Sequence, residues 1–142
     1  MSWPDRLEWL EIAMALLRAQ VRVRVVPFRR LASGFDSSDP GSVAPPMPSS
    51  AERERVSLRM RHRVARMAAL LPVRVACLGQ SLAAADLLRR RGCDVRMYLG
   101  TTVPTAGFAA HAWLCSEGVV VTGEREAAAF TAVASFFGRG RG

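Results

Sequence analysis

The 142-residue sequence predicts a single α+β domain in which helices pack on a small antiparallel sheet. Amphipathic helical patterns dominate the first part of the chain, and strand-like alternation with a tight turn follows in the second. Half of the residues are hydrophobic, which is enough for one buried core, whereas the length is too short for two domains.

The first predicted helix covers residues 3–26, with Pro4 in its first turn and Pro27 after its end. We expect its apolar stripe to pack into the core of the domain. A partner helix, or shallow association with a membrane surface through the nearby arginines, are the alternatives. The stripe repeats at spacings of three and four and comprises Leu7, Leu10, Met14, Leu17 and Val21, widened by Trp9, Ile12 and Leu16.

A second helix follows a segment of different composition. Residues 33–50 are rich in serine, proline, glycine and aspartate, which is typical of a linker or a long surface loop. Ser49 and Glu52 have capping-box spacing and predict a helix start at Ser49, and Pro72 ends the helix. His62 falls among arginines and is expected in solvent, whereas the buried stripe comprises Val56, Met60, Val64, Met67 and Leu71.

A third helix is predicted from about Cys77 to Arg91, because Gly92 suits the left-handed conformation that ends helices. The following segments are predicted as a strand at 95–99, a loop at 100–107, strands at about 109–115 and 119–122 joined by Glu117 and Gly118, and a helix near 126–136. The predicted division is therefore an N-terminal amphipathic helix with a basic segment (1–32), a linker or surface loop (33–50), a core (51–137) and a disordered tail (138–142).

The composition excludes several classes of protein. A net charge of +8 suggests nucleic-acid binding, but all 20 basic residues are arginines spread along the chain, as expected from a GC-rich genome. No nucleic-acid motif or aromatic stacking cluster accompanies them, so no nucleic-acid partner is expected. Two histidines and three scattered cysteines lack zinc-ligand spacing, so we expect no metal and no cofactor.

The composition also bears on location. No apolar run reaches the roughly 20 residues that a membrane span needs, and the N-terminus does not resemble a secretory signal. Three cysteines without a repeating pattern suit a reducing compartment better than a disulfide framework. The sequence therefore predicts a cytoplasmic protein.

Cys77 and His111 form the candidate catalytic pair. Cys77 opens the third predicted helix, where unpaired backbone N–H groups and the positive end of the helix dipole favour the nucleophilic thiolate. His111 lies in strand-like sequence and would supply the base, an arrangement typical of a papain- or transglutaminase-type thiol site. The alternative for Cys77 is a buried, inert thiol, as we expect for Cys93 and Cys115.

The predicted hairpin suggests a third catalytic residue. If residues 117 and 118 form the turn, counting back along both strands places His111 opposite Glu124. A carboxylate there would orient the imidazole, which makes Glu124 the candidate orienting acid. The alternative is that Glu124 begins the last helix as a favourable first-turn acid.

Gln80 is a candidate supporting residue because it lies one helical turn after Cys77. Its amide would donate a hydrogen bond to an oxyanion beside the nucleophile, together with the backbone N–H groups at the helix start. The alternative is a polar helix residue that packs near a loop.

Three segments together resemble a known family: the cysteine segment 71–82, the segment 87–92 that ends in arginine and glycine, and His111-Ala112-Trp113-Leu114. Their order and spacing resemble the leader peptidase of lasso-peptide biosynthesis, a branch of the transglutaminase-like cysteine proteases. Residues 25–31 also resemble the end of that family's first helix and the basic segment after it.

The resemblance implies a papain/transglutaminase-like fold, with the small antiparallel sheet packed on the nucleophile helix and the cysteine peptidase core at 51–137. It implies that the protein removes the leader from a ribosomally synthesised precursor before macrocyclisation. Cys77 would be the nucleophile, His111 the general base and Trp113 a supporting residue. The short chain resembles the split form, whose partners are the precursor peptide, a small leader-binding recognition protein and an ATP-dependent lasso cyclase.

Two positions differ from the family pattern. Cys115 stands where the family usually has an acidic residue, and the orienting aspartate falls close to Gly123, which leaves Glu124 as a shifted substitute. The alternative functions are a non-catalytic scaffold that presents the precursor to the cyclase, and a thiol acyltransferase of the same fold, because an amine can resolve a thioester as well as water can.

Overall fold

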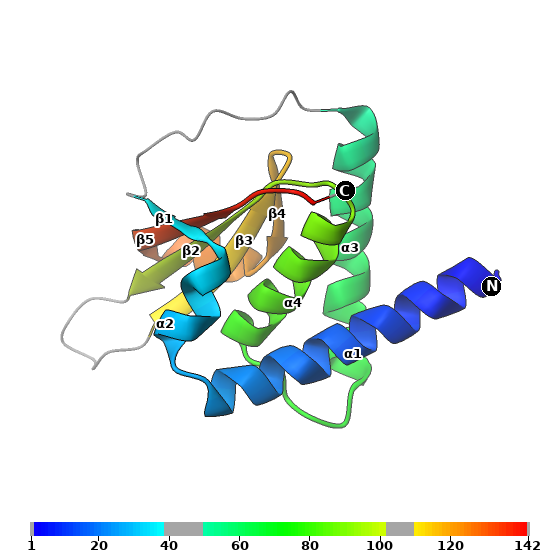
Figure 1. Ribbon diagram of the computed structural model, residues 1–142, viewed down its shortest axis with the longest axis horizontal. Coiled ribbons are helices and arrows are strands. Elements are labelled where there is room, and N and C mark those ends of the chain that lie inside the picture. The colour runs from blue at the N-terminus through cyan, green and yellow to red at the C-terminus, as the bar shows by residue number, and fades with distance from the viewer. Residues whose placement is uncertain (1, 39–49, 102–109, 142) are drawn as a thin grey trace.

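The computed structural model describes residues 2–38, 50–101 and 110–141 (Figure 1). The helical elements in these residues are α1 (Trp3–Val25), α2 (Phe28–Leu31), the 3₁₀ turn η1 (Ala32–Gly34), α3 (Ala51–Leu70), α4 (Cys77–Arg90) and α5 (Glu124–Ala129). The strands are β1 (Asp36–Ser38), β2 (Val95–Thr101), β3 (Ala110–Ser116), β4 (Val119–Thr122) and β5 (Thr131–Gly138). They form one antiparallel sheet in the order β1-β5-β2-β3-β4.

The predicted α+β class is confirmed. Helix α4 packs on β2, β3 and β4, and α1 and α3 pack on α4 in turn, as Figure 1 shows. Leu87 and Leu88 of α4 are fully buried between the sheet and the two other helices. Because α4 begins at Cys77, this central packing fixes the position of the predicted nucleophile.

Helix α3 follows its predicted pattern. Met60 and Val64 are fully buried, and Val56, Met67 and Leu71 pack partly buried against the core. The cap differs by one residue from the prediction, because Ser50 accepts the hydrogen bond from the Arg53 N–H at 3.1 Å. His62 is exposed, as expected.

The predicted burial of the apolar stripe of α1 is wrong for its main positions, whereas Ile12 and Leu16, which were predicted to widen it, are fully buried. Leu7, Leu10, Met14 and Val21 are 49 to 60% exposed, and Leu17 is half-buried. The opposite face is buried instead, through Ile12, Ala15, Leu16 and Ala19. Two physical causes explain this choice of face: its small alanines permit close packing, and acidic side chains beside it pair with arginines of the neighbouring helices.

These ion pairs tie α1 to the rest of the domain. Glu8 accepts from Arg59 at 3.0 Å and from Arg63 at 2.8 Å, both on α3. Glu11 pairs with Arg90 and Arg91 at the end of α4. The helix that we assigned to a separate N-terminal segment therefore shares one core with α3 and α4.

The C-terminal region differs from the predicted helix at 126–136. Helix α5 stops at Ala129, and β5 begins at Thr131 and pairs with both β2 and β1. Residues 131–138 contain β-branched and aromatic side chains, which favour a strand. Phe136 is buried there against the core.

Two segments that we predicted as irregular carry structure. Within the predicted linker, residues 36–38 form β1 on the edge of the sheet, whereas residues 39–49 lie outside the described residues. In the predicted disordered tail, the Gly140 N–H donates to Asp94 Oδ1 and the Arg141 N–H donates to the Arg89 carbonyl, both at 2.7 Å. Most of the predicted loop 100–107 also lies outside the described residues.

No helix in the described ranges is both long enough and apolar enough to cross a membrane.

Candidate thiol active site

The start of α4 is held from two sides. The N-cap residue is Ala76, and its backbone N–H donates to Gln20 Oε1 of α1 at 3.0 Å. Gln80 Nε2, one turn into the helix, donates to the Val75 carbonyl at 3.0 Å, and Val75 itself is buried. These contacts fix the main chain immediately before Cys77 and the direction in which it enters α4.

Gly79 permits this close packing. A Cβ at this position would lie 3.1 Å from Val75 Cγ1 and 3.2 Å from Gln20 Oε1, tighter than most real contacts. The helix start has no side-chain cap, because alanine cannot accept from the first-turn N–H groups. No capping side chain accepts a hydrogen bond from these N–H groups, which lie beside Cys77. They are therefore donors that an oxyanion formed at Cys77 could use.

The sheet brings a further donor to the sulfur. Strand β4 pairs with β3 from Leu114 to Ser116, so the earlier part of β3 has no sheet partner on that side among the described residues. The freed backbone N–H of Ala112 donates to Cys77 Sγ, with an N–S distance of 3.4 Å. Cys77 Sγ therefore has both a backbone N–H donor and a helix N-terminus beside it.

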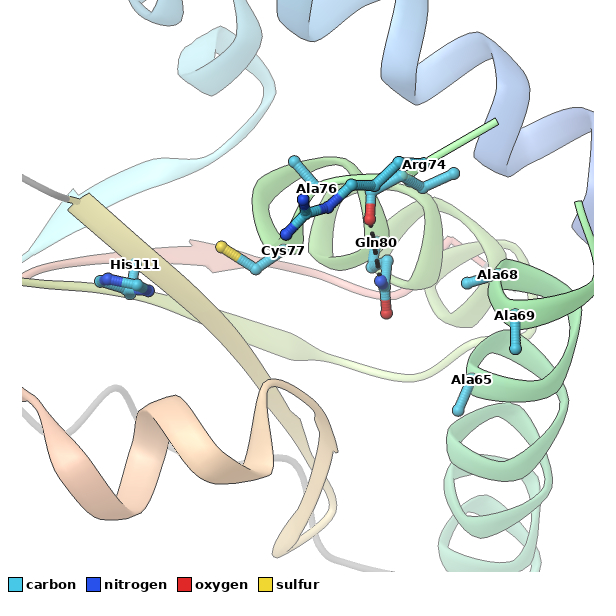
Figure 2. A pocket seen from close by; sticks show the side chains of 9 residues that line it. Ala65, Ala68, Ala69, Arg74, Ala76, Cys77, Gln80 and His111 are labelled. Atoms are coloured by element: carbon cyan, nitrogen blue, oxygen red, sulfur yellow. Dashed lines mark hydrogen bonds between the residues drawn. The ribbon is translucent and has the colours of Figure 1, made fainter. Parts of the chain in front are cut away.

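Cys77 and His111 open onto one pocket. Figure 2 shows the Cys77 sulfur pointing from the start of α4 toward β3, on which His111 lies. The cavity has a volume of about 620 Å³, a size that suits a ligand or a short stretch of peptide. It is lined by Ala65, Ala68, Ala69, Arg74, Val75, Ala76, Cys77, Gln80 and His111. The three alanines come from α3, and their small side chains leave the space open.

The His111 ring is held by an aromatic contact. Phe130, between α5 and β5, stacks on the imidazole with a centroid distance of 4.0 Å and an interplanar angle of 10°. Across the described parts of the chain, no residue forms a hydrogen bond with the His111 ring nitrogens. As far as the described residues are concerned, both nitrogens can contact a thiol, a substrate or water. Phe130 was not predicted from the sequence, since nothing in the local pattern links it to His111.

The family is shown by comparison with known sequences. The family model of the Transglutaminase-like superfamily matches residues 13–135. The chain belongs to this superfamily. The match extends from α1 into β5 and includes both Cys77 and His111. The transglutaminase-like superfamily includes cysteine peptidases and acyltransferases, and its enzymes commonly depend on a cysteine. No curated protein and no solved structure matches the chain.

In this transglutaminase-like chain, the predicted hairpin turn is confirmed but the predicted position of Glu124 is wrong. Glu117 and Gly118 both have positive φ, and Ser116 pairs with Val119. A bulge between Leu114 and Cys115 then shifts the register by one residue, and β4 ends at Thr122. Glu124 is consequently not opposite His111.

Glu124 instead begins α5, which was the alternative interpretation. Its side chain is 68% exposed and accepts from Arg61 Nη2 at 2.5 Å. Nothing in this arrangement directs the carboxylate to the imidazole. The geometry therefore gives no support to Glu124 as the orienting acid.

We expect Glu124→Ala to change turnover less than about twofold and to lower the free energy of unfolding by less than about 1 kcal/mol, because the exposed Arg61 pair and the first-turn position contribute little. Arg61→Ala, which removes the same pair from the other side, is the matched control. Turnover and melting temperature of both variants check this. A slowing of a hundredfold or more in Glu124→Ala alone would restore the carboxylate to the catalytic site.

Gly123, near the family's orienting aspartate, cannot carry that side chain in this conformation. Its φ is +71°, and a Cβ would lie 2.7 Å from the Ala112 carbonyl oxygen and 2.7 Å from Trp113 Cβ. Within the described residues, no carboxylate hydrogen-bonds to the His111 ring.

Trp113 and Gln80 have different surroundings. Trp113 is buried and stacks on Tyr98 of β2 at a centroid distance of 5.6 Å, which ties β3 to β2 two residues after His111. The Trp113 ring fills the space next to Gly100. A Cβ added to Gly100 would lie only 2.7 Å from this ring. Gln80 lines the pocket shared by Cys77 and His111, but one N–H of its amide is already used by the Val75 carbonyl. Oxyanion binding by Gln80 would use the other N–H.

The other two thiols lie outside the pocket. Cys93 is fully buried and Cys115 is half-buried on β3. Burial raises the pKa of both thiols, so both are protonated at neutral pH. The described residues contain no group of three histidine, cysteine or acidic side chains placed to hold a metal ion.

We expect iodoacetamide to label Cys77 before the other cysteines at pH 7, because a neutral buried thiol reacts slowly. The half-life of each thiol can be followed by peptide mass spectrometry of the folded protein. Protein unfolded in urea serves as the control, and there all three thiols should react at similar rates. Faster labelling of Cys93 or Cys115 in the folded protein would contradict this assignment.

Proposed function

We propose that this chain is a cysteine peptidase that removes the leader from a lasso-peptide precursor before macrocyclisation. The observation that carries the proposal is the single pocket on which Cys77 and His111 converge, at an uncapped helix start. Membership of the transglutaminase-like superfamily supports thiol chemistry. The lasso-peptide assignment rests on the resemblance of residues 71–82, 87–92 and 111–114 to that family's leader peptidases.

The proposed reaction uses the two residues in turn. His111 accepts the thiol proton, and Cys77 Sγ attacks the carbonyl carbon of the scissile peptide bond. The oxyanion is held by the free N–H groups at the start of α4. As the tetrahedral intermediate collapses, the carbon–nitrogen bond breaks, the imidazolium protonates the departing amine, and the leader remains as a thioester on Cys77. Water, deprotonated by His111, then releases the leader carboxylate and restores the thiol.

The partners follow from the proposed reaction. The freed amine of the core peptide would go to a separate lasso cyclase in the cytoplasm. Leader recognition would belong to a small recognition protein, as the resemblance to the split form of the leader peptidase implies.

We expect the isolated protein to cleave a lasso-peptide precursor slowly, and to cleave it much faster after addition of the recognition protein. The gain comes from holding the scissile bond at the pocket. Chromatography of the products with and without the partner measures it, with a precursor whose leader sequence is scrambled away from the scissile bond as the control. Equal rates with and without the partner would contradict delegated recognition.

The thiol acyltransferase remains a second candidate, because the superfamily includes acyltransferases and the same thioester serves both reactions. Product analysis separates the two. A peptidase yields a leader with a free carboxylate, whereas an acyltransferase yields a leader joined to an added amine.

A further inference from the structure

We propose that the exposed face of α1 is a docking surface for an acidic amphipathic helix of a partner protein. This surface, called the α1 stripe below, is formed by large apolar side chains that the domain leaves uncovered. Those of Trp3, Leu7, Leu10, Met14, Val21 and Val25 are 49 to 70% exposed. The opposite face of the same helix is fully used by the core, so α1 cannot bury the stripe by rotating.

The spacing of the α1 stripe favours a helix as its partner. From Trp3 to Val21 the apolar positions alternate between steps of four and three residues, with half-buried Leu17 completing the series. A strict alternation of this kind forms a narrow seam, as in coiled coils, rather than a broad apolar face. A helix that lies in a membrane surface needs the broader face.

A groove deepens the stripe at its C-terminal end. A cavity of about 210 Å³ lies between α1 and the segment that precedes α4. Its apolar walls are Leu17, Val21 and Val73, and Val73 is 44% exposed. A depression of this size accepts one large apolar side chain, in the way a knob enters a hole between packed helices.

The charged residues beside the α1 stripe determine which charge a partner helix should carry. The acidic side chains of α1, Asp5, Glu8 and Glu11, are paired with arginines of α3 and α4. Arg6 and Arg24 on one side of the stripe and Arg18 on the other are exposed, and they form no ion pair with a described residue. Positions beside a helical seam select partners by charge, so an acidic helix is favoured.

The same charges disfavour a second copy of this chain. Two α1 helices packed through their stripes would bring arginines against arginines in either direction, without acidic side chains free to compensate. The surface also lies close to the catalytic pocket, because Arg74 lines both the groove and that pocket. A bound helix would therefore sit beside the opening to Cys77. The inference concerns binding and holds whether or not the chain is a leader peptidase.

The test uses the full-length protein and two synthetic heptad-repeat peptides with identical leucine seams, one flanked by glutamates and the other by lysines. We expect the glutamate peptide to bind at least roughly tenfold more tightly by fluorescence anisotropy, with a preference that weakens as salt rises. Leu10→Glu combined with Met14→Glu should lose this binding. Leu58→Glu, at an exposed apolar position on α3, is the matched control and should keep it.

Charge reversal makes the test independent of folding. Arg6→Glu combined with Arg24→Glu should transfer the preference to the lysine peptide while the melting temperature stays unchanged. The proposal would be overturned if both peptides bound equally well or if neither peptide bound. It would also be overturned if the protein bound phosphatidylglycerol vesicles but neither peptide, or if it formed a dimer that Leu10→Glu with Met14→Glu dissolved.

Discussion

Cys77→Ala is expected to slow precursor cleavage by about 10⁴- to 10⁶-fold, the range seen when a nucleophile is removed from a peptidase. The thiol is the atom that attacks, and no other described cysteine lines the pocket. The fold should survive, because the half-buried Cys77 side chain makes a single hydrogen bond, with the Ala112 N–H. Single-turnover rates and melting temperatures, measured with the recognition protein present, check both statements.

The other two cysteines supply the controls for this variant. Cys115→Ala and Cys93→Ala should retain most activity, since both thiols lie away from the pocket. Cys93→Ala should lower stability, because Cys93 is fully buried. Full activity in Cys77→Ala would remove the nucleophile assignment, and loss of activity in Cys115→Ala with an intact fold would redirect it.

His111→Gln is expected to slow cleavage by about 10²- to 10⁴-fold, the usual contribution of a general base. Glutamine keeps a planar polar group beside Phe130 but cannot accept the thiol proton. His111→Ala should behave similarly and should recover part of its activity in added imidazole, which can occupy the space next to the Phe130 ring. Turnover of His111→Gln within twofold of the natural protein, at equal stability, would exclude His111 as the base.

The start of the nucleophile helix and the hairpin turn were predictable because their signals are local. Glycine after α4, proline before it and the Glu117-Gly118 pair act on their own backbone through short-range sterics, and the structure has each element where the sequence predicts it. The structure places Cys77 and His111 on one pocket, but this proximity depends on the packing of α4 on β3, which local signals do not determine.

The buried face of α1 could not be predicted from its pattern. Both faces carry apolar side chains, so periodicity alone does not say which one meets the core. The decision depends on Ala15 and Ala19, whose small size permits close packing, and on ion pairs of Glu8 and Glu11 with distant arginines. These are tertiary interactions, which a helical period does not contain.

The predicted position of Glu124 was wrong for a related reason. The count along the hairpin was correct for its first two pairs, Ser116 with Val119 and Cys115 with Val120. A bulge between Leu114 and Cys115 then shifted every pair farther from the turn by one residue. A bulge arises from packing of the strand on its neighbours, so the turn does not determine it. The stacking of Phe130 on His111 likewise depends on β5, whose pairing with β2 joins segments far apart in the chain.

The most direct test of the central claim is cleavage of the precursor in H₂¹⁸O, with the recognition protein present, followed by mass spectrometry of both products. If Cys77 carries the leader as a thioester that water resolves, the leader gains one ¹⁸O at its new carboxylate and the core peptide gains none. The account would be contradicted if the precursor stayed intact under these conditions, or if the leader were released joined to an amine without ¹⁸O.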